Sequence, residues 1–132
     1  MKPKTQQPDL AGLRVLVVED NYVLAESMRW ALEGYGSVVV GPAPNTARAF
    51  ELLESSEVDG AILDIDLQGK SSAPIADRLR AAGVPFLFLT GYDGAILLPQ
   101  HLHDVICLSK PVDPDTLAGT LLETMHPPDS SD

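Results

Sequence analysis

Short apolar runs alternate with amphipathic stretches along most of the chain. The runs lie at residues 13–18, 37–41, 59–64, 84–89 and 105–108, and none of them shows a regular alternation of apolar and polar residues. Such runs are typical of strands that are covered on both faces of a parallel sheet. The pattern therefore predicts five strands.

The stretches between these runs have helical spacing. After the first strand, Leu24, Met28, Ala31 and Tyr35 recur at intervals of three and four residues, which predicts a helix over 22–33. The same kind of spacing predicts further helices at 75–82 and 114–125. A capping residue, Asn45 or Thr46, predicts a helix through about residue 54, and a weaker signal indicates a short helix near 95–98.

Strand and helix alternate through the chain, and this order predicts an α/β fold of the doubly wound type. We expect a five-stranded parallel sheet with helices on both faces. Among the orders that right-handed crossovers permit, we choose the flavodoxin-like order 2-1-3-4-5. Residues 12–126 would form this domain, between a flexible N-terminal lead-in at 1–11 and a disordered tail at 127–132.

Residues that can carry chemistry follow four of the five predicted strands. Asp64 ends the third strand, Glu19-Asp20 follows the first, Thr90 the fourth and Lys110 the fifth. The carboxyl ends of parallel strands share one edge of the sheet, where ligands bind in open α/β folds. In the chosen order the first and third strands are neighbours, so we expect these side chains to converge.

The converging residue types suit phosphoryl transfer. Asp20 and Asp64 offer carboxylate oxygens to a hard cation such as Mg²⁺, with Glu19 acting through a water. A carboxylate in this position can attack phosphorus and form an aspartyl phosphate. The transferred group has three oxygens that need positive or donating partners, and the Lys110 ammonium and the Thr90 hydroxyl can each serve one.

The amino-acid composition argues against several other classes of protein. The net charge of −10 disfavours direct nucleic-acid binding, which normally requires a basic face. No apolar run approaches the roughly 20 residues of a membrane helix, and the N-terminus lacks the apolar core of a signal peptide. The single cysteine, Cys107, cannot form an internal disulfide, and we expect it to be buried in the fifth strand of a cytoplasmic protein.

The ordered set of strand-end residues, with Pro111 after the lysine, resembles the receiver domain of bacterial response regulators over about residues 13–125. The resemblance implies that a histidine kinase or a histidine phosphotransfer protein transfers a phosphoryl group to Asp64, with Mg²⁺ or Mn²⁺ as cofactor. It also implies that the backbone carbonyl of Asp66 is a metal ligand and that the Lys110–Pro111 bond is cis.

The resemblance further implies a mode of signalling. The protein would catalyse only its own phosphorylation and dephosphorylation. As a stand-alone receiver, it would signal by docking to a downstream protein target or by passing the phosphoryl group on in a relay. We expect a monomer or a weak homodimer, without contacts to nucleic acid or a membrane.

Two positions depart from the family pattern. Gln68 stands where many receivers have proline, four residues after the phosphoacceptor, and Cys107 stands where most carry an aromatic residue that takes part in the conformational switch. The segment 88–92 is similar to the Phe-Ala-Thr-Gly signature of a receiver subgroup that also lacks this aromatic residue. Tyr92 is a candidate replacement for it.

Two other functions fit parts of the sequence. A receiver-like binding module that is never phosphorylated is compatible with Gln68 and Cys107, although such modules usually lose one of the site residues. Asp64-Ile65-Asp66 also matches the Asp-x-Asp motif of haloacid-dehalogenase-type phosphatases, but that family places the motif on its first strand and adds a cap. Phosphoryl uptake in the presence of Mg²⁺ separates the three functions.

Three remaining residues have structural explanations. His101 and His103 lack a third ligand at a spacing suited to a transition metal, so we expect them on the surface. Trp30 lies off the main apolar stripe of the first helix, and we interpret it as part of a broad packed face.

Overall fold

The computed structural model describes residues 8–91 and 98–125. In these residues the long strands are β1 (Arg14–Val18), β2 (Val38–Ala43), β3 (Gly60–Asp64), β6 (Phe86–Thr90) and β7 (Cys107–Ser109), and two short strands are β4 (Asp66–Leu67) and β5 (Lys70–Ser71). The helices are α1 (Tyr22–Gly34), α2 (Thr46–Ser55), α3 (Ala73–Ala81) and α4 (Pro114–Met125), with a short 3-10 helix, η3, at Gln100–Leu102.

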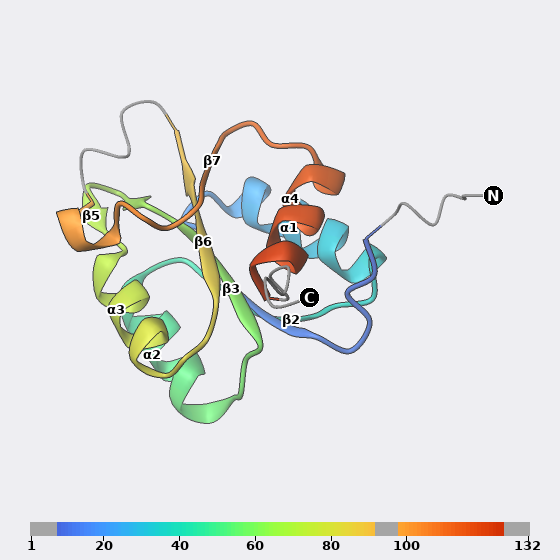
Figure 1. Ribbon diagram of the computed structural model, residues 1–132, viewed down its shortest axis with the longest axis horizontal. Coiled ribbons are helices and arrows are strands. Elements are labelled where there is room, and N and C mark those ends of the chain that lie inside the picture. Colours follow the sequence, from blue (N-terminus) through green and yellow to red (C-terminus); the bar gives the residue numbers. More distant parts are fainter. Residues whose placement is uncertain (1–7, 92–97, 126–132) are drawn as a thin grey trace, which may run out of the picture.

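The long strands form one parallel sheet in the order β2-β1-β3-β6-β7. Counted among the strands of this sheet alone, it is the predicted order 2-1-3-4-5. Helices α1 and α4 cover one face of the sheet, and α2 and α3 cover the other (Figure 1). The prediction of a doubly wound α/β fold is confirmed.

Strand register brings the carboxyl ends of the central strands together. Val18 pairs with Leu63 across β1 and β3, and Asp64 pairs with Leu89 across β3 and β6. The next strand, β7, pairs in the same direction with the end of β6 at Thr90. Residues that follow these strands directly therefore leave the sheet at the same edge.

Each face of the sheet has its own apolar core because side chains alternate along a strand. In β1, Val15 and Val17 belong to the core beneath α1 and α4, whereas Leu16 and Val18 belong to the core beneath α2 and α3. All four side chains are fully buried. This double coverage explains why the strand segments of the sequence are apolar at consecutive positions.

Polar side chains fix the starts of three helices. Asn21, Asn45 and Asp113 accept hydrogen bonds from backbone N–H groups in the first turns of α1, α2 and α4, at 2.9, 2.9 and 3.1 Å. Such caps satisfy N–H groups that have no partner within the helix. The cap at Asn21 makes α1 begin immediately after the acidic pair and so limits the positions that this pair can take.

The second strand and the loop after the third differ from the prediction. β2 does not end at Gly41 but continues through a cis Gly41–Pro42 bond to Ala43, because β2 is an edge strand, where proline is tolerated. Segment 65–71, which lies between the predicted third strand and third helix and was assigned to neither, contains the antiparallel pair β4–β5. Its Gln-Gly turn is not one of the strong hairpin signals in a sequence.

Two burial predictions are wrong. Cys107 is exposed, because β7 is the last strand of the sheet and pairs on one side only within the described residues. Trp30 is 74% exposed, because the buried face of α1 is formed by Ala25, Met28 and Leu32 on the opposite side of the helix.

Some expectations concern the termini and the segment after β6. Tyr92, almost all of the helix expected near 95–98, and the tail at 127–132 lie outside the described residues. Leu10, which we assigned to the lead-in, is fully buried, and its N–H donates to the carbonyl of Tyr35 at 2.9 Å. Packing therefore begins before residue 12. Among the described helices, none combines the length and the apolar character needed to cross a membrane.

Substitution of a buried valine should cost far more stability than substitution of an exposed one. Val17 is fully buried in β1, whereas Val38 in the edge strand β2 is 46% exposed. Val17→Ala should lower the free energy of unfolding by about 2 kcal/mol, because it removes two buried methyl groups and leaves a cavity. Val38→Ala, the matched control, should lower it by less than about 1 kcal/mol. Urea unfolding measures both values, and equal losses would contradict this burial pattern.

Candidate functional site

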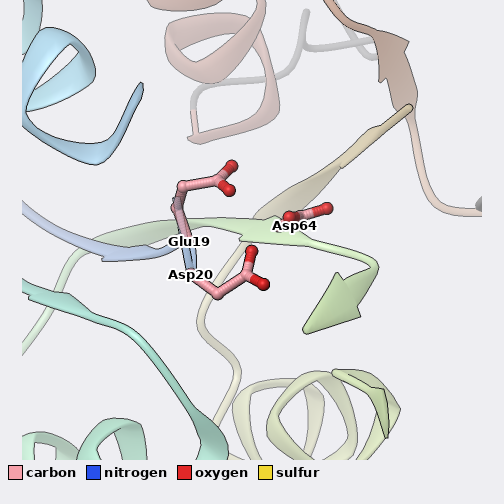
Figure 2. A group of neighbouring side chains, drawn as sticks. All are labelled: Glu19, Asp20 and Asp64. Carbon is pink, nitrogen blue, oxygen red and sulfur yellow. The ribbon is translucent and has the colours of Figure 1, made fainter. Parts of the chain in front are cut away.

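Three acidic side chains gather at the carboxyl edge of the sheet. Glu19 and Asp20 follow β1 directly, and Asp64 is the last residue of the neighbouring strand β3. One carboxylate oxygen from each lies within 4.8 Å of the others (Figure 2). Glu19 and Asp64 are only 2% and 3% exposed, while Asp20 is partly exposed. The ends of the first and third strands thus converge as expected.

The Lys110 ammonium group lies against two of these carboxylates. Lys110 follows β7, and its Nζ donates a hydrogen bond of 3.1 Å to Asp64 Oδ2 and lies 3.0 Å from Glu19 Oε1. Both carboxylates are out of water, so salt screens these ion pairs less than it screens pairs on the surface. The Lys110–Pro111 bond is cis, as the family resemblance implied.

Backbone N–H groups contact the other oxygens of the two buried carboxylates. The N–H of Asn21 donates to Glu19 Oε2 at 3.1 Å, and the N–H of Asp66 donates to Asp64 Oδ1 at 3.3 Å. Glu19 Oε1, although close to the lysine, has no hydrogen bond of suitable geometry in the described part of the chain. It is a buried oxygen with spare capacity for a positive partner.

Burial changes the proton affinity of the site. The loss of hydration raises the pKa of Glu19 to about 7, although the neighbouring Lys110 opposes the rise. Burial also raises the pKa of Asp64, again against the effect of the lysine. Burial by itself would lower the pKa of Lys110, but the hydrogen bond to Asp64 and the electrostatic attraction to both carboxylates outweigh it and raise that pKa. The ammonium therefore stays charged at neutral pH, whereas metal-free Glu19 is partly protonated.

The donor set fits a hard divalent cation. Three carboxylates meet at one point beside one lysine, and Glu19 Oε1 is buried without a hydrogen bond. Both features favour binding of a further cation, and oxygen ligands suit Mg²⁺ or Mn²⁺ better than softer metals. Asp20 and Asp64 also line an open hollow of about 540 Å³, which gives a hydrated ion access to them. The residues present therefore fit the metal that the sequence implied.

Thr90 and Asp66 lie near the site but are engaged elsewhere. The Thr90 hydroxyl donates to the carbonyl of Gly91 at 3.0 Å and makes no hydrogen bond to Asp64 in the described part of the chain. The Asp66 side chain accepts a hydrogen bond of 2.6 Å from the N–H of Gly69. The side chain of Asp66 thus serves the turn of the β4–β5 hairpin, which leaves its backbone carbonyl as the candidate metal ligand.

The hollow also contains residues that sequence reasoning did not select as site residues. Asn21, Gln68 and Gly91 complete its lining. The position of Asn21, directly after the acidic pair, was a usable signal. Gln68 stands out in the sequence only as a departure from the family pattern, because the hairpin that places it in the lining of the hollow is not visible in the sequence.

Comparison with known proteins identifies relatives of the chain. The family model of the response regulator receiver domain matches residues 15–122. The phyllosphere-induced regulator PhyR of Methylorubrum extorquens is 27% identical over 114 residues, which are 84% of this chain and 43% of PhyR. The sensory transduction protein LytT of Bacillus subtilis is 30% identical over 112 residues, which are 83% of this chain and 46% of LytT. The chain spans less than half the length of these two relatives.

Solved structures show the same architecture. The solution structure of SdrG from Sphingomonas melonis is 30% identical to this chain, with a TM-score of 0.76, and the match covers 87% of this chain and 97% of SdrG. The crystal structure of the response regulator PhyR from Brucella abortus has a TM-score of 0.77 at 22% identity and covers 92% of this chain and 50% of that chain. The second likeness shows the fold alone.

Mg²⁺ should stabilise the protein more at high pH than at low pH. Folding raises the pKa of Glu19 from 4.5 to about 7, so between these values the folded state binds more protons than the unfolded state. The metal-free protein therefore loses stability as the pH rises through this window. A cation that binds the ionised carboxylates offsets the loss, so Mg²⁺ should raise Tm more at about pH 8 than at about pH 5.

Thermal unfolding in Mg²⁺ and in EDTA measures this difference. Glu19→Gln cannot ionise at this position. Without Mg²⁺ the variant should therefore lose less stability between the two pH values, and it should gain less from the metal. An equal effect of Mg²⁺ at both pH values would contradict the assignment of the metal site.

Proposed function

The chain belongs to the family of response regulator receiver domains of two-component systems, and we propose that it accepts a phosphoryl group on Asp64 from a histidine kinase or a histidine phosphotransfer protein. The observation that supports the proposal best is the position of Asp64. Its buried carboxylate ends β3 between the Lys110 ammonium and the acidic pair that follows β1. A nucleophile, a cation and a donor set for a divalent metal are thus combined at one edge of the sheet.

Asp64 is the proposed nucleophile. One of its carboxylate oxygens attacks the phosphorus of the donor's phosphohistidine, the bond between phosphorus and the histidine nitrogen breaks, and the electron pair stays on that nitrogen. The N–H of Asp66 and the ammonium of Lys110 each contact one oxygen of Asp64, so the carboxylate is held in a fixed orientation before the donor arrives. The product is an aspartyl phosphate.

Lys110 and Thr90 would stabilise the charge that arrives with the phosphoryl group. Lys110 Nζ lies 3.1 Å from Asp64 Oδ2, so it can form a charge-assisted hydrogen bond to a phosphoryl group attached there. The Thr90 hydroxyl, which contacts the adjacent Gly91 carbonyl before phosphorylation, would turn to a phosphoryl oxygen.

A divalent cation, Mg²⁺ or Mn²⁺, is the proposed cofactor. Asp20 and Asp64 would hold it directly, with Glu19 acting through a water and with the backbone carbonyl of Asp66 as a further ligand. When bound, it would neutralise negative charge on the phosphoryl oxygens. The protein would act only on its own phosphorylation and dephosphorylation, unlike a classical enzyme that turns over a separate substrate.

The two alternative functions are not favoured. Asp64 ends the third strand of the chain, whereas haloacid-dehalogenase-type phosphatases carry their motif on the first strand. A binding module that is never phosphorylated would not require the contacts among Lys110, Glu19 and Asp64. The proposed output is instead a phosphorylation-dependent contact with a downstream protein or onward transfer of the phosphoryl group in the cytoplasm. The acidic net charge of −10 favours a protein over nucleic acid as the direct target.

The proposed phosphodonor would dock on α1, beside the site. A groove of about 500 Å³ lies between α1 and the segment after β7, and Lys110 is part of its lining. On α1, the helix that forms one wall of this groove, Val23 and Trp30 are 76% and 74% exposed. They are two helical turns apart and so lie on one face. Exposed aromatic and apolar side chains beside a groove are typical of protein contact surfaces. The apolar lining consists of Leu24, Met28, Ala31, Leu89, Pro111, Val112, Pro114 and Leu117.

Incubation with acetyl phosphate and Mg²⁺ should add one phosphoryl group to the protein. Intact-mass spectrometry measures the addition. Asp64→Asn should remain unmodified, because a neutral amide oxygen is a far weaker nucleophile than a carboxylate, and EDTA should prevent modification of the wild-type protein. A protein that stays unmodified with acetyl phosphate and with phosphorylated histidine kinases would support the binding module instead. Continuous release of phosphate without modification would support a phosphatase.

Trp30→Ala should slow phosphoryl transfer from a protein donor but not from acetyl phosphate. We expect about a tenfold loss in the transfer rate from a phosphorylated histidine kinase, because truncation of an aromatic anchor typically costs a contact surface about 1.4 kcal/mol or more. Val38→Ala removes apolar surface from an exposed position of β2 that is not part of the groove lining, and it should leave both rates unchanged. Equal rates for Trp30→Ala and the wild-type protein with the kinase would rule out this docking surface.

A further inference from the structure

The segment between β3 and α3 forms a hairpin beside the site. β4 and β5 pair antiparallel, with Leu67 opposite Lys70, and Gln68 and Gly69 form the two-residue turn between them. Both turn residues have positive φ, at 58° and 85°. Glycine adopts such angles freely, whereas glutamine rarely does. A side chain held in this region is a reason to look for a function.

The hairpin is fixed to the rest of the domain at several points. Leu67 is buried in the core. The N–H of Gly69 donates to Asp66 Oδ1 at 2.6 Å, and the N–H of Ser72 donates to the carbonyl of Ile65 at 2.9 Å, which closes the base of the hairpin. Gln68 therefore stands on an anchored turn, and the position of its backbone relative to Asp64 is set by the fold.

Gln68 lines the hollow that contains Asp64 and Lys110. It is also exposed, so water reaches this residue. The other neutral amide in the lining, Asn21, is used differently, since its Oδ1 accepts the 2.9 Å hydrogen bond from Leu24 that caps α1.

Hydrolysis of a phosphorylated Asp64 requires a water molecule in line with the phosphorus. The ionised carboxylates in the hollow can only accept hydrogen bonds, and the Lys110 ammonium can only donate them. The neutral amide of Gln68 can do both. Its carbonyl can accept a hydrogen bond from the water while its NH₂ group donates to a phosphoryl oxygen, which brings the water and the phosphorus together.

We propose that Gln68 is a positioning residue for hydrolysis of phosphorylated Asp64 and thereby sets the lifetime of that form. The inference rests on the proposed function of Asp64. In the step, the water oxygen bonds to phosphorus, the bond from phosphorus to the Asp64 oxygen breaks, and its electron pair returns to the Asp64 carboxylate. Both protons of the water leave on the released inorganic phosphate.

Substitutions at Gln68 separate the effect of its side chain from that of its backbone. The wild-type protein and the variants are phosphorylated with acetyl phosphate and Mg²⁺, the donor is removed by desalting, and the phosphorylated fraction is followed by intact-mass spectrometry.

Gln68→Gly accepts the positive φ without strain and Gln68→Ala does not, but both remove the amide. We expect both to lengthen the half-life about tenfold. Gln68→Asn keeps an amide and tolerates positive φ, so its half-life should lie between those of Gln68→Gly and the wild-type protein. Lys70→Ala, in the same hairpin, should keep the wild-type half-life.

Several outcomes would overturn the inference. A wild-type half-life for Gln68→Gly would do so, as would a change in Gln68→Ala that Gln68→Gly does not share, because that result assigns the effect to the backbone. Half-lives that follow the urea unfolding midpoints of the variants rather than the presence of the amide would also overturn it. All three outcomes leave the phosphorylation of Asp64 intact. Failure of the wild-type protein to take up a phosphoryl group, measured before desalting, would instead overturn the proposed function and this inference together.

Discussion

The arrangement of the site depends on holding Glu19 and Asp64 out of water beside one ammonium group. Each carboxylate loses most of its hydration, and one lysine cannot neutralise both of them together with Asp20. The apolar strands that end in these residues hold the charges in place, since Val18 and Leu63, one residue before the acids, are fully buried and paired with each other. Packing of the sheet thus maintains an excess of negative charge at its edge. The relief of that excess by a cation would provide the driving force for the proposed metal binding.

The central architecture could be predicted because its signals are local. Apolar runs specify buried parallel strands, and their alternation with helices restricts the sheet to few orders, so the convergence of Glu19 and Asp64 followed from strand order alone. The errors concern features that depend on distant neighbours. Cys107 is exposed because β7 lies at the edge of the sheet, and Trp30 is exposed because α1 is rotated so that Met28 and Leu32 face the core. Neither the edge position nor the helix rotation is specified by the residue itself.

The exposure of Cys107 also bears on how a signal could leave the site. A small side chain on an open edge cannot act as a ring that moves between buried and exposed positions. A backbone connection is present instead: the N–H of Lys110 donates to the carbonyl of Thr90 at 2.8 Å, and Thr90 pairs with Ser109 in the sheet. Any movement of Thr90 and Lys110 toward a phosphoryl group would therefore displace β6 and β7 together. In this chain, the paired ends of β6 and β7 connect the site to the edge strand β7.

The glutamine at position 68 and the hairpin around it are best understood as one feature. Proline fixes φ near about −65°, so the turn geometry at this position, with a φ of 58°, excludes the proline that is common in the family. Replacement of proline is thus a requirement of the β4–β5 turn and does not indicate a site that has lost its function. The same turn occupies the Asp66 side chain through the N–H of Gly69 and leaves the acidic cluster at Glu19, Asp20 and Asp64 intact. The departure from the family pattern therefore changes one residue in the lining of the hollow, Gln68, and preserves the acidic cluster.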